Sequence, residues 1–234
     1  MVDFHSHVLP DMDDGADRVE TSLAMFRESR AQGVKLLCAT SHFYADEESP
    51  ASFLARRQAA WDRLRKAMYP GESWPEIRLG AEILYFPGMS VADELSSLTL
   101  EGTVFLLVEP PMMTWSESML EEIEECGARL HRIPVIAHVD RYMRMLGDGS
   151  LLDRVGRRRM LAQVNASFFL HRSCREQALK SLTAGKFQFI GSDCHDMAAR
   201  RPNLGDAAKV ASRSLGEEPL QKFSELARRA MSVG

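Results

Sequence analysis

Short apolar runs alternate with helical patterns along nearly the whole chain, and this alternation restricts the fold more than any other feature. The runs are almost continuously apolar, as expected for strands buried on both faces of a parallel sheet. Seven candidate strands lie at residues 2–4, 35–40, 77–84, 103–108, 133–137, 162–165 and 187–191. The pattern therefore predicts an α/β fold built on a parallel sheet.

Helical signals occupy the segments between these runs. Asp17 and Glu20 form a capping-box pattern at the start of the first helix, and Gly33 suits its end. Apolar stripes with helical spacing are Val19, Leu23 and Phe26, then Met119, Ile123, Cys126 and Leu130. Further helices are expected over residues 173–185 and 202–233.

Seven units of this kind predict a distorted, TIM-like (β/α)7 barrel, and an open doubly wound sheet is the alternative. We expect one domain over residues 1–234, because single α/β barrels commonly reach this size and no linker or repeat divides the chain. In such barrels the chemistry gathers at the carboxyl ends of the strands.

Composition and charge exclude several classes of function. The net charge of −4 gives no sign of nucleic-acid binding, which requires clustered excess Lys and Arg. No apolar run approaches the roughly 20 residues of a membrane span, and no signal-peptide pattern opens the chain. The four cysteines form no Cys-x2-Cys pair. We therefore expect a cytoplasmic protein that does not insert into membranes.

Two histidines stand one residue apart at the start of the chain, in Phe-His-Ser-His at residues 4–7. Alternate side chains of an extended strand leave on the same face. His5 and His7 can therefore point at one ion, and the strand end offers half of a metal site.

The ends of the other predicted strands carry similar residues. They are Asp14 in an Asp-Asp-Gly loop, His42, Glu82, Glu109, His138, and the pair Asp193 and His195. A lone histidine after a strand is more often a hydrogen-bonding residue than a ligand. Six strand ends that all carry His, Asp or Glu would be an improbable coincidence without a shared site, so together they indicate metal binding. His131 and His171 fall in or beside helical segments, and we expect no role for them.

Mixed imidazole and carboxylate donors suit Zn, Mn or Fe better than Ca or Mg. Nine candidate ligands are too many for one ion, so two or three divalent metal ions are expected. Closely spaced ions make a bridging hydroxide the nucleophile and can clamp an in-line displacement at phosphorus.

The charge of such a centre favours a phosphate substrate. Four ligand carboxylates against three divalent ions leave about +2 before hydroxide is counted, which attracts a phosphomonoester dianion. Arg141 and Arg200 follow His138 and His195 closely enough to grip phosphate oxygens.

These motifs resemble one family in their order and content. His-x-His, Asp-Asp-Gly, Ala-Thr-Ser-His, Gly-Ala-Glu, Val-Ile-Ala-His-x-x-Arg-Tyr and Ser-Asp-x-His run from residue 5 to about residue 202. Together they resemble the polymerase-and-histidinol-phosphatase (PHP) superfamily. Within it, the chain is most similar to the bacterial manganese-dependent protein tyrosine phosphatases of capsule and exopolysaccharide gene clusters.

The resemblance implies a distorted (β/α)7 barrel and three metal ions, with manganese favoured and iron or zinc as alternatives. His5, His7, Glu82 and Asp193 would hold the first ion, Glu82, Glu109 and His138 the second, and Asp14, His42 and His195 the third. Arg141 and Arg200 would match the phosphate-binding arginines, although Arg201 is an alternative to Arg200.

The implied function is hydrolysis of phosphotyrosine in a cytoplasmic bacterial tyrosine kinase that regulates capsule or exopolysaccharide synthesis. The sequence does not determine the oligomeric state. Relatives form rings or smaller assemblies, so a homo-oligomer is compatible with the resemblance, and residues 17–30 are one candidate contact surface. Two other functions stay open. One is a small-molecule phosphatase of the histidinol-phosphatase type, and the other is a kinase-binding regulator whose metals are structural.

Cysteine catalysis is a further rival, because Cys126 to Arg132 and Cys194 to Arg200 have the Cys-x5-Arg spacing of cysteine-dependent tyrosine phosphatases. Cys126 lies on an apolar helical stripe, where a structural thiol is expected. Cys194 lies beside Asp193, whose charge opposes thiolate formation, and no glycine-rich phosphate loop follows it. We expect neither cysteine to be the nucleophile.

Overall fold

The structure is a computed structural model, and it describes residues 1–232. Its strands are β1 (Val2–Ser6), β2 (Leu36–Ala39), β3 (His42–Phe43), β4 (Glu76–Leu79), β5 (Glu82–Leu84), β6 (Phe105–Glu109), β7 (Ile133–Ile136), β8 (Leu161–Asn165) and β9 (Phe189–Gly191). They form two parallel sheets, in the orders β1-β2-β4 and β3-β5-β6-β7-β8-β9.

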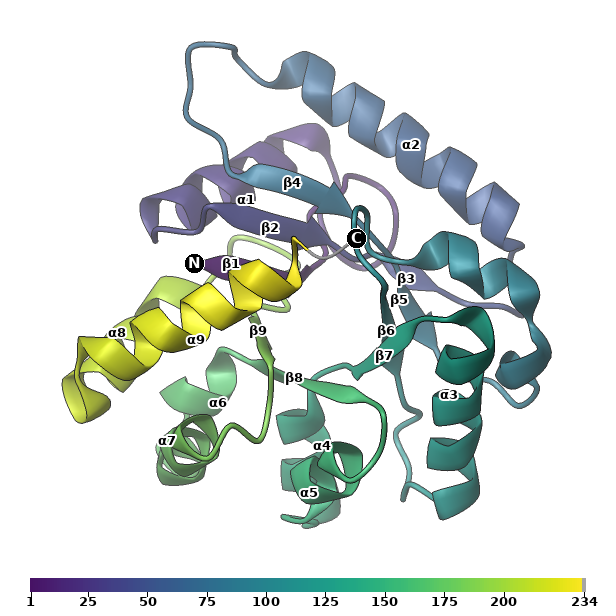
Figure 1. Ribbon diagram of the computed structural model, residues 1–234. Helices are drawn as coiled ribbons and strands as arrows, with labels where there is room; N and C mark the ends of the chain where they lie inside the picture. Colours follow the sequence, from purple (N-terminus) through teal and green to yellow (C-terminus); the bar gives the residue numbers. More distant parts are fainter. Residues whose placement is uncertain (233–234) are drawn as a thin grey trace.

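The two sheets curl into one distorted barrel (Figure 1). β1 meets the end of β9 through a parallel bridge between Ser6 and Cys194, and the Asp193 amide donates to the His5 carbonyl at 2.9 Å. The predicted α/β barrel is therefore confirmed as a curled parallel sheet, and the open doubly wound sheet is wrong.

A break in one predicted strand and one additional short strand account for nine strands at seven predicted positions. The strand predicted at 77–84 divides at Gly80 and Ala81 into β4 and β5, and β3 follows β2 after a break at Thr40 and Ser41. β2 pairs with β4, whereas β3 pairs with β5. After each break the chain leaves the first sheet, which contains β2 and β4, and joins the second sheet, which contains β3 and β5.

Helices surround the strands (Figure 1). They are α1 (Val19–Ala31), α2 (Pro50–Ala67), α3 (Glu117–Leu130), α4 (Val139–Leu146), α5 (Leu151–Gly156), α6 (Ser167–Leu170), α7 (Arg175–Thr183), α8 (Leu204–Leu215) and α9 (Glu217–Ala230), with 3-10 turns η1 (Met89–Val91) and η2 (Asp93–Leu98). Within residues 1–232, no helix is both long enough and apolar enough to cross a membrane.

Two of the helix predictions need correction. The capping box is wrong, because the N-cap of α1 is Arg18 and makes no side-chain cap bond, while Asp17 accepts a hydrogen bond from the Thr21 hydroxyl at 2.6 Å. The helix predicted at 202–233 divides into α8 and α9 at Gly216, whose φ of +81° suits glycine. The end of that prediction, Val233, lies outside the described residues.

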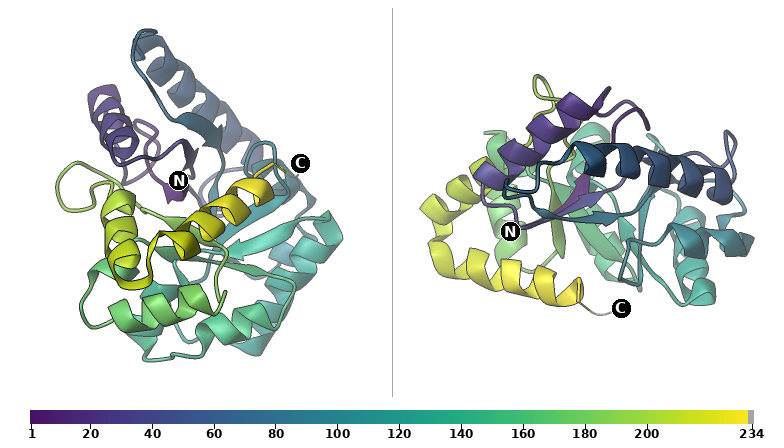
Figure 2. Two further views of the ribbon diagram at one scale, coloured as in Figure 1. Left: turned by 60° about the vertical axis from the view of Figure 1, so that its left-hand side comes forward. Right: turned by 90° about the horizontal axis from the view of Figure 1, so that it is seen from above.

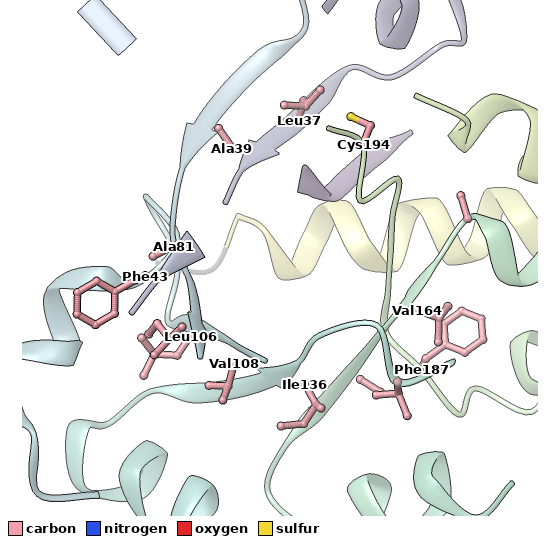
Figure 3. Close-up of a cluster of buried hydrophobic side chains, with 14 of the residues drawn as sticks. Leu37, Ala39, Phe43, Ala81, Leu106, Val108, Ile136, Val164, Phe187 and Cys194 are labelled. Atoms are coloured by element: carbon pink, nitrogen blue, oxygen red, sulfur yellow. The ribbon is translucent and has the colours of Figure 1, made fainter. Parts of the chain in front are cut away.

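The hydrophobic residues form two layers. One layer, which includes Leu37, Leu106, Val108, Ile136 and Val164, lies between strands and helices (Figure 3). The other layer contains residues of β1, β2, β6, β7 and β9 together with two residues from the end of the chain, Ala227 and Met231. Since α9 packs across β1 (Figure 2), apolar side chains close the amino end of the barrel, and polar residues are left for the carboxyl end.

Candidate metal centre

His5 and His7 approach each other as their spacing predicts. Their Nε2 atoms are 3.0 Å apart, and both rings are buried. The pairing of β1 with β2 shifts register between Asp3 and Ser6, and a break in regular pairing of this kind can re-aim side chains. Phe4 can therefore stack on Phe189 in the apolar layer while its neighbour His5 enters the polar site.

Glu82 lies at the centre of the site and is fully buried. Its Oε2 atom is 3.1 Å from His5 Nε2, 3.2 Å from His7 Nε2 and 3.1 Å from His42 Nδ1. Its Oε1 atom is 2.9 Å from His138 Nε2. One carboxylate thus touches four imidazoles, which come from three different segments of the chain.

We call the residues His5, His7, Glu82, His138 and Asp193 the inner cluster. All five are buried, with at most 5% of the residue exposed. His138 and Asp193 both adopt positive φ angles, +32° and +52°, just after strands β7 and β9. Such strained backbone concentrates at functional sites.

We call Asp14, His42 and His195 the outer cluster. Asp14 Oδ1 lies 3.6 Å from His42 Nε2 and 3.2 Å from His195 Nε2. The side chain of Asp14 is 62% exposed, whereas that of His195 is 2% exposed. Glu109 lies between the clusters, 3.3 Å from His138 Nε2 and 3.7 Å from His42 Nδ1.

The structure therefore brings all nine residues that the sequence singled out to the carboxyl end of the strands. Their donor atoms fall into four groups with mutual distances within 4.8 Å: His7, Asp14, His42 and His195; His5, Glu82 and His138; His5, His7 and Asp193; His42, Glu82 and Glu109. His131 and His171 belong to none of these groups.

The donor atoms fit metal ions. Glu82 Oε2, His42 Nδ1 and His195 Nε2 are buried and have no hydrogen-bond partner within residues 1–232. Buried polar atoms are rarely left unpaired, and all three face the centre of the site. Metal ions bound there would give each of these atoms a partner.

Two arginines border the centre. Arg141 donates to Asp193 and lies 3.7 Å from Glu109 Oε1. Arg200 donates to Asp193 Oδ1 at 2.9 Å and to Asp14 Oδ2 at 3.4 Å. Arg201, the alternative to Arg200, faces Asp206 at 3.7 Å instead. Of the two neighbours, Arg200 is therefore the one that reaches the site.

Asp13 is a site residue whose role the sequence did not reveal. Its Oδ2 atom accepts hydrogen bonds from His7 Nδ1 at 2.8 Å and from the His42 amide at 2.9 Å, and its Oδ1 atom accepts from the Gly15 amide at 3.0 Å. A proton on Nδ1 leaves Nε2 of His7 free to act as a ligand. Asp13 and Asp14 are adjacent and chemically identical, so the orienting role of Asp13 appears only in the structure.

Gln163 has a comparable position under the inner cluster. Its Oε1 atom lies 3.2 Å from His5 Nδ1 and accepts a hydrogen bond from the His138 amide at 2.6 Å. Its Nε2 atom donates to Asn165, which in turn donates to Asp193 Oδ2 at 2.8 Å. The available signal for Gln163 was its place as a polar residue between the apolar Ala162 and Val164 of a predicted strand.

Two glycines allow the chain to approach the histidines closely. A Cβ atom at Gly15 would lie 2.3 Å from the His7 carbonyl oxygen, and one at Gly191 would lie 2.5 Å from His5 Cβ. Both distances are too short for any other residue.

The two clusters hold their protons differently. Burial alone would lower the pKa of His138, but Glu109 and Glu82 outweigh it and raise the pKa to about 9. Burial is likewise outweighed at His7, where Asp13 and Glu82 hold the pKa well above its ordinary value. In the outer cluster burial prevails, lowering the pKa of His42 and bringing that of His195 to about 3.

The cysteines lie apart from this chemistry. Cys126 and Cys194 are buried, and burial raises the pKa of the Cys126 thiol to about 11 and that of Cys194 well above its usual value. Neither thiol is poised to ionise, as the sequence predicted.

The fold and the site define an α/β barrel with a centre of histidines and carboxylates suited to several metal ions. The sequence profile of the family described as capsular polysaccharide synthesis, CpsB/CapC, matches residues 1–230. The chain belongs to this family.

Individual relatives agree with this assignment. The tyrosine-protein phosphatase CpsB of Streptococcus agalactiae is 28% identical over 231 residues, which cover 93% of this chain and 92% of the relative. The tyrosine-protein phosphatase YwqE of Bacillus subtilis is also 28% identical, over 93% of this chain and 86% of the relative.

A solved structure shows the same fold. It comes from work on YwqE from Bacillus subtilis and CpsB from Streptococcus pneumoniae, described as unique metal-dependent tyrosine phosphatases. The TM-score is 0.85 at 24% identity, and the match covers 100% of this chain and 96% of the other.

Proposed function

We propose that the protein is a metal-dependent tyrosine-protein phosphatase that acts on a cytoplasmic bacterial tyrosine kinase of capsule or exopolysaccharide synthesis. The observation that carries the proposal is the contact of Glu82 with four histidines at the polar end of the barrel. Membership of the CpsB/CapC family and the relatives named as tyrosine-protein phosphatases support it.

The ligand sets are those that the family resemblance implies. His5, His7, Glu82 and Asp193 would hold one ion, Glu82, Glu109 and His138 a second, and Asp14, His42 and His195 a third. The groups of neighbouring donor atoms overlap these sets without coinciding with them, because one group joins His5 with Glu82 and His138 and another joins His42 with Glu82 and Glu109. The mixed nitrogen and oxygen donors suit manganese, with iron or zinc as alternatives. When bound, such ions supply a nucleophile from water at neutral pH and offset charge on the phosphoryl group.

The protein's own residues bind and orient the phosphate. Arg141 and Arg200 approach Asp193 from two sides, so their guanidinium groups can grip the phosphate oxygens of a substrate at the site mouth. Asp13 and Gln163 hold the imidazoles of His7 and His5 in place. Each contact is made before substrate arrives, which lowers the cost of reorganisation during the reaction.

The leaving group explains why no acid catalyst is required. The phenol of tyrosine has a pKa near 10, so its anion departs more readily than an alkoxide. Water can then protonate the phenolate. A metal centre bordered by two arginines therefore suits aryl phosphates, whose leaving group departs without a general acid.

The test combines metal analysis of the purified protein with hydrolysis of a phosphotyrosine peptide before and after chelation. We expect two or three ions per chain, loss of activity on chelation, and recovery with manganese. An alkyl phosphate assayed in parallel should be turned over more slowly. Activity that survives complete chelation would contradict the proposal, and metal content without hydrolysis would favour a binding regulator.

A further inference from the structure

Tyr44 lies at the edge of the metal centre and is not one of its donor residues. It follows β3 directly and stands two residues after His42. The Tyr44 ring stacks on the His42 imidazole with centroids 5.4 Å apart and an interplanar angle of 19°. The residue is half-buried, so part of the ring faces solvent at the polar end of the barrel.

The main chain at Tyr44 is firmly held, whereas the end of its side chain is not. The Tyr44 carbonyl accepts hydrogen bonds from the Glu47 and Glu48 amides at 3.1 and 3.2 Å. The preceding residue, Phe43, is buried and packs edge-on against Phe53 with centroids 5.6 Å apart. Within residues 1–232 the Tyr44 hydroxyl makes no hydrogen bond. The ring is thus positioned in advance, and nothing in the described chain explains its exposed part.

The position of His42 shows what the ring borders. His42 Nδ1 lies 3.1 Å from Glu82 of the inner cluster, and His42 Nε2 lies 3.6 Å from Asp14 of the outer cluster. Tyr44 is therefore one imidazole away from both clusters. A group attached to a phosphate bound between the two clusters can therefore reach the Tyr44 ring across His42.

We propose that Tyr44 is a specificity-determining residue whose ring packs against the aryl group of the substrate and selects aryl over alkyl phosphomonoesters. This inference rests on the proposed function and names the residue that recognises its substrate class. Aromatic pairs prefer stacked or edge-to-face contacts with centroids about 4.5–7 Å apart, and such a pair favours binding by about two- to tenfold beyond area burial.

The experiment measures binding without hydrolysis. Phenylphosphonate and methylphosphonate share a phosphonate group that cannot be hydrolysed, and they differ in the aryl ring. Their dissociation constants are measured by calorimetry on the full-length, manganese-loaded protein. The readout is the dissociation constant of methylphosphonate divided by that of phenylphosphonate. A structural defect that weakens the binding of both ligands equally leaves this ratio unchanged.

Three variants separate recognition from structure. In Tyr44→Leu the ratio should fall about two- to tenfold, and in Tyr44→Phe it should stay as in the unaltered protein. Tyr69→Leu is the matched control, because Tyr69 is 69% exposed just beyond the end of α2, and its ratio should not change. Metal content should be equal in all four proteins.

An unchanged ratio in Tyr44→Leu would overturn the inference, and so would a parallel loss of both ligands. A ratio that falls equally in Tyr44→Phe would overturn it as well, because the hydroxyl rather than the ring would then be responsible. Failure of the proposed function looks different. The unaltered protein would then fail to hydrolyse a phosphotyrosine peptide, whatever the ratio of the two constants.

Discussion

The inner and outer clusters use the same side chains in opposite environments. The inner cluster is buried from all sides and contains two carboxylates, Glu82 and Asp193, which neighbouring histidines and arginines keep ionised despite burial. The outer cluster has one carboxylate, Asp14, whose side chain is 62% exposed. Both clusters meet at Glu82 and His42, 3.1 Å apart.

This difference indicates a division of labour. The inner cluster is held by Asp13 and Gln163 and has its charges paired, so its geometry is set by folding. The outer cluster relies on an exposed acid and on histidines that stay neutral. We therefore expect the inner ions to be bound tightly and the outer ion to exchange with solvent.

The largest effect should follow from removing the charge shared by the clusters. Glu82→Gln keeps the shape of the side chain but weakens contacts to four histidines. We expect kcat/KM on a phosphotyrosine peptide to fall by more than about 100-fold, beyond the range for residues that only orient ligands. Glu94→Gln, at an exposed position, is the control. Substantial activity in Glu82→Gln would mean that the clusters work separately.

A smaller loss is expected when an inner histidine loses its orienting partner. Asp13→Asn weakens the 2.8 Å contact to His7 Nδ1, so metal affinity and activity should fall about 10- to 100-fold. Asp11→Asn changes an exposed acid in the same loop and should have no effect. Metal titration monitored by activity distinguishes the two. If both variants had the same metal affinity and activity, Asp13 would have no role in orienting the metal ligands.

The outer cluster should lose activity in a recoverable way. Asp14→Asn removes its one carboxylate, so activity at limiting manganese should fall about tenfold and return with excess metal. Asp193→Asn, the inner counterpart, should not recover. If added manganese rescued both variants alike, the difference in exposure between the clusters would have no functional meaning.

The two clusters should also differ in the protons that their histidines release when metal binds. In the metal-free protein the pKa of His138 is about 9, so the ring is protonated at pH 7 and must lose its proton on binding metal. His195, with a pKa of about 3, is already neutral. Metal binding to the inner cluster should therefore strengthen as the pH rises towards 9, while the outer cluster should be insensitive above pH 5.

Calorimetry of metal binding in buffers of different ionisation enthalpy checks this prediction, and a binding enthalpy independent of the buffer would contradict it.

The raised pKa of His138 also affects the stability of the metal-free fold. Because the folded pKa of His138 is raised, it stabilises the metal-free fold fully below its ordinary pKa of about 6.5. That contribution should be lost as the pH rises through about 9.

The smallest effect is expected at the buried thiol. Cys194→Ala should change kcat/KM by less than about twofold, because burial raises the pKa of this thiol and leaves no thiolate at neutral pH. His5→Ala, measured beside it, should abolish activity. The reverse pattern would make Cys194 the nucleophile and both clusters structural.

Much of this organisation was predictable from local pattern. Continuous apolar runs placed all seven strand positions, since burial on both faces selects such runs. Polar residues at the strand ends identified the nine members of the site, because parallel strands bring their carboxyl ends to one rim. The start of α1 was misjudged, because Asp17 bonds Thr21 instead of capping the helix.

Other features had no local signal. The register shift in β1, at which Phe4 joins the apolar layer and His5 reaches Glu82, depends on pairing with β2. The breaks before β3 and β5 depend on which sheet each segment joins. Arg200 and Arg201 are neighbours of the same type, and only the folded chain turns Arg200 towards Asp193 and the distant Asp14 while Arg201 faces Asp206.

The sequence by itself determined the barrel class, the rim that carries the chemistry and the residue types available there, because each depends on periodicity and on strand ends. Only the tertiary structure decided which acid orients and which is exposed, how the clusters share Glu82, and where Tyr44 stands. These properties are distances between segments as far apart as residues 5 and 193. No local pattern encodes them, because burial and charge pairing arise only when the barrel closes.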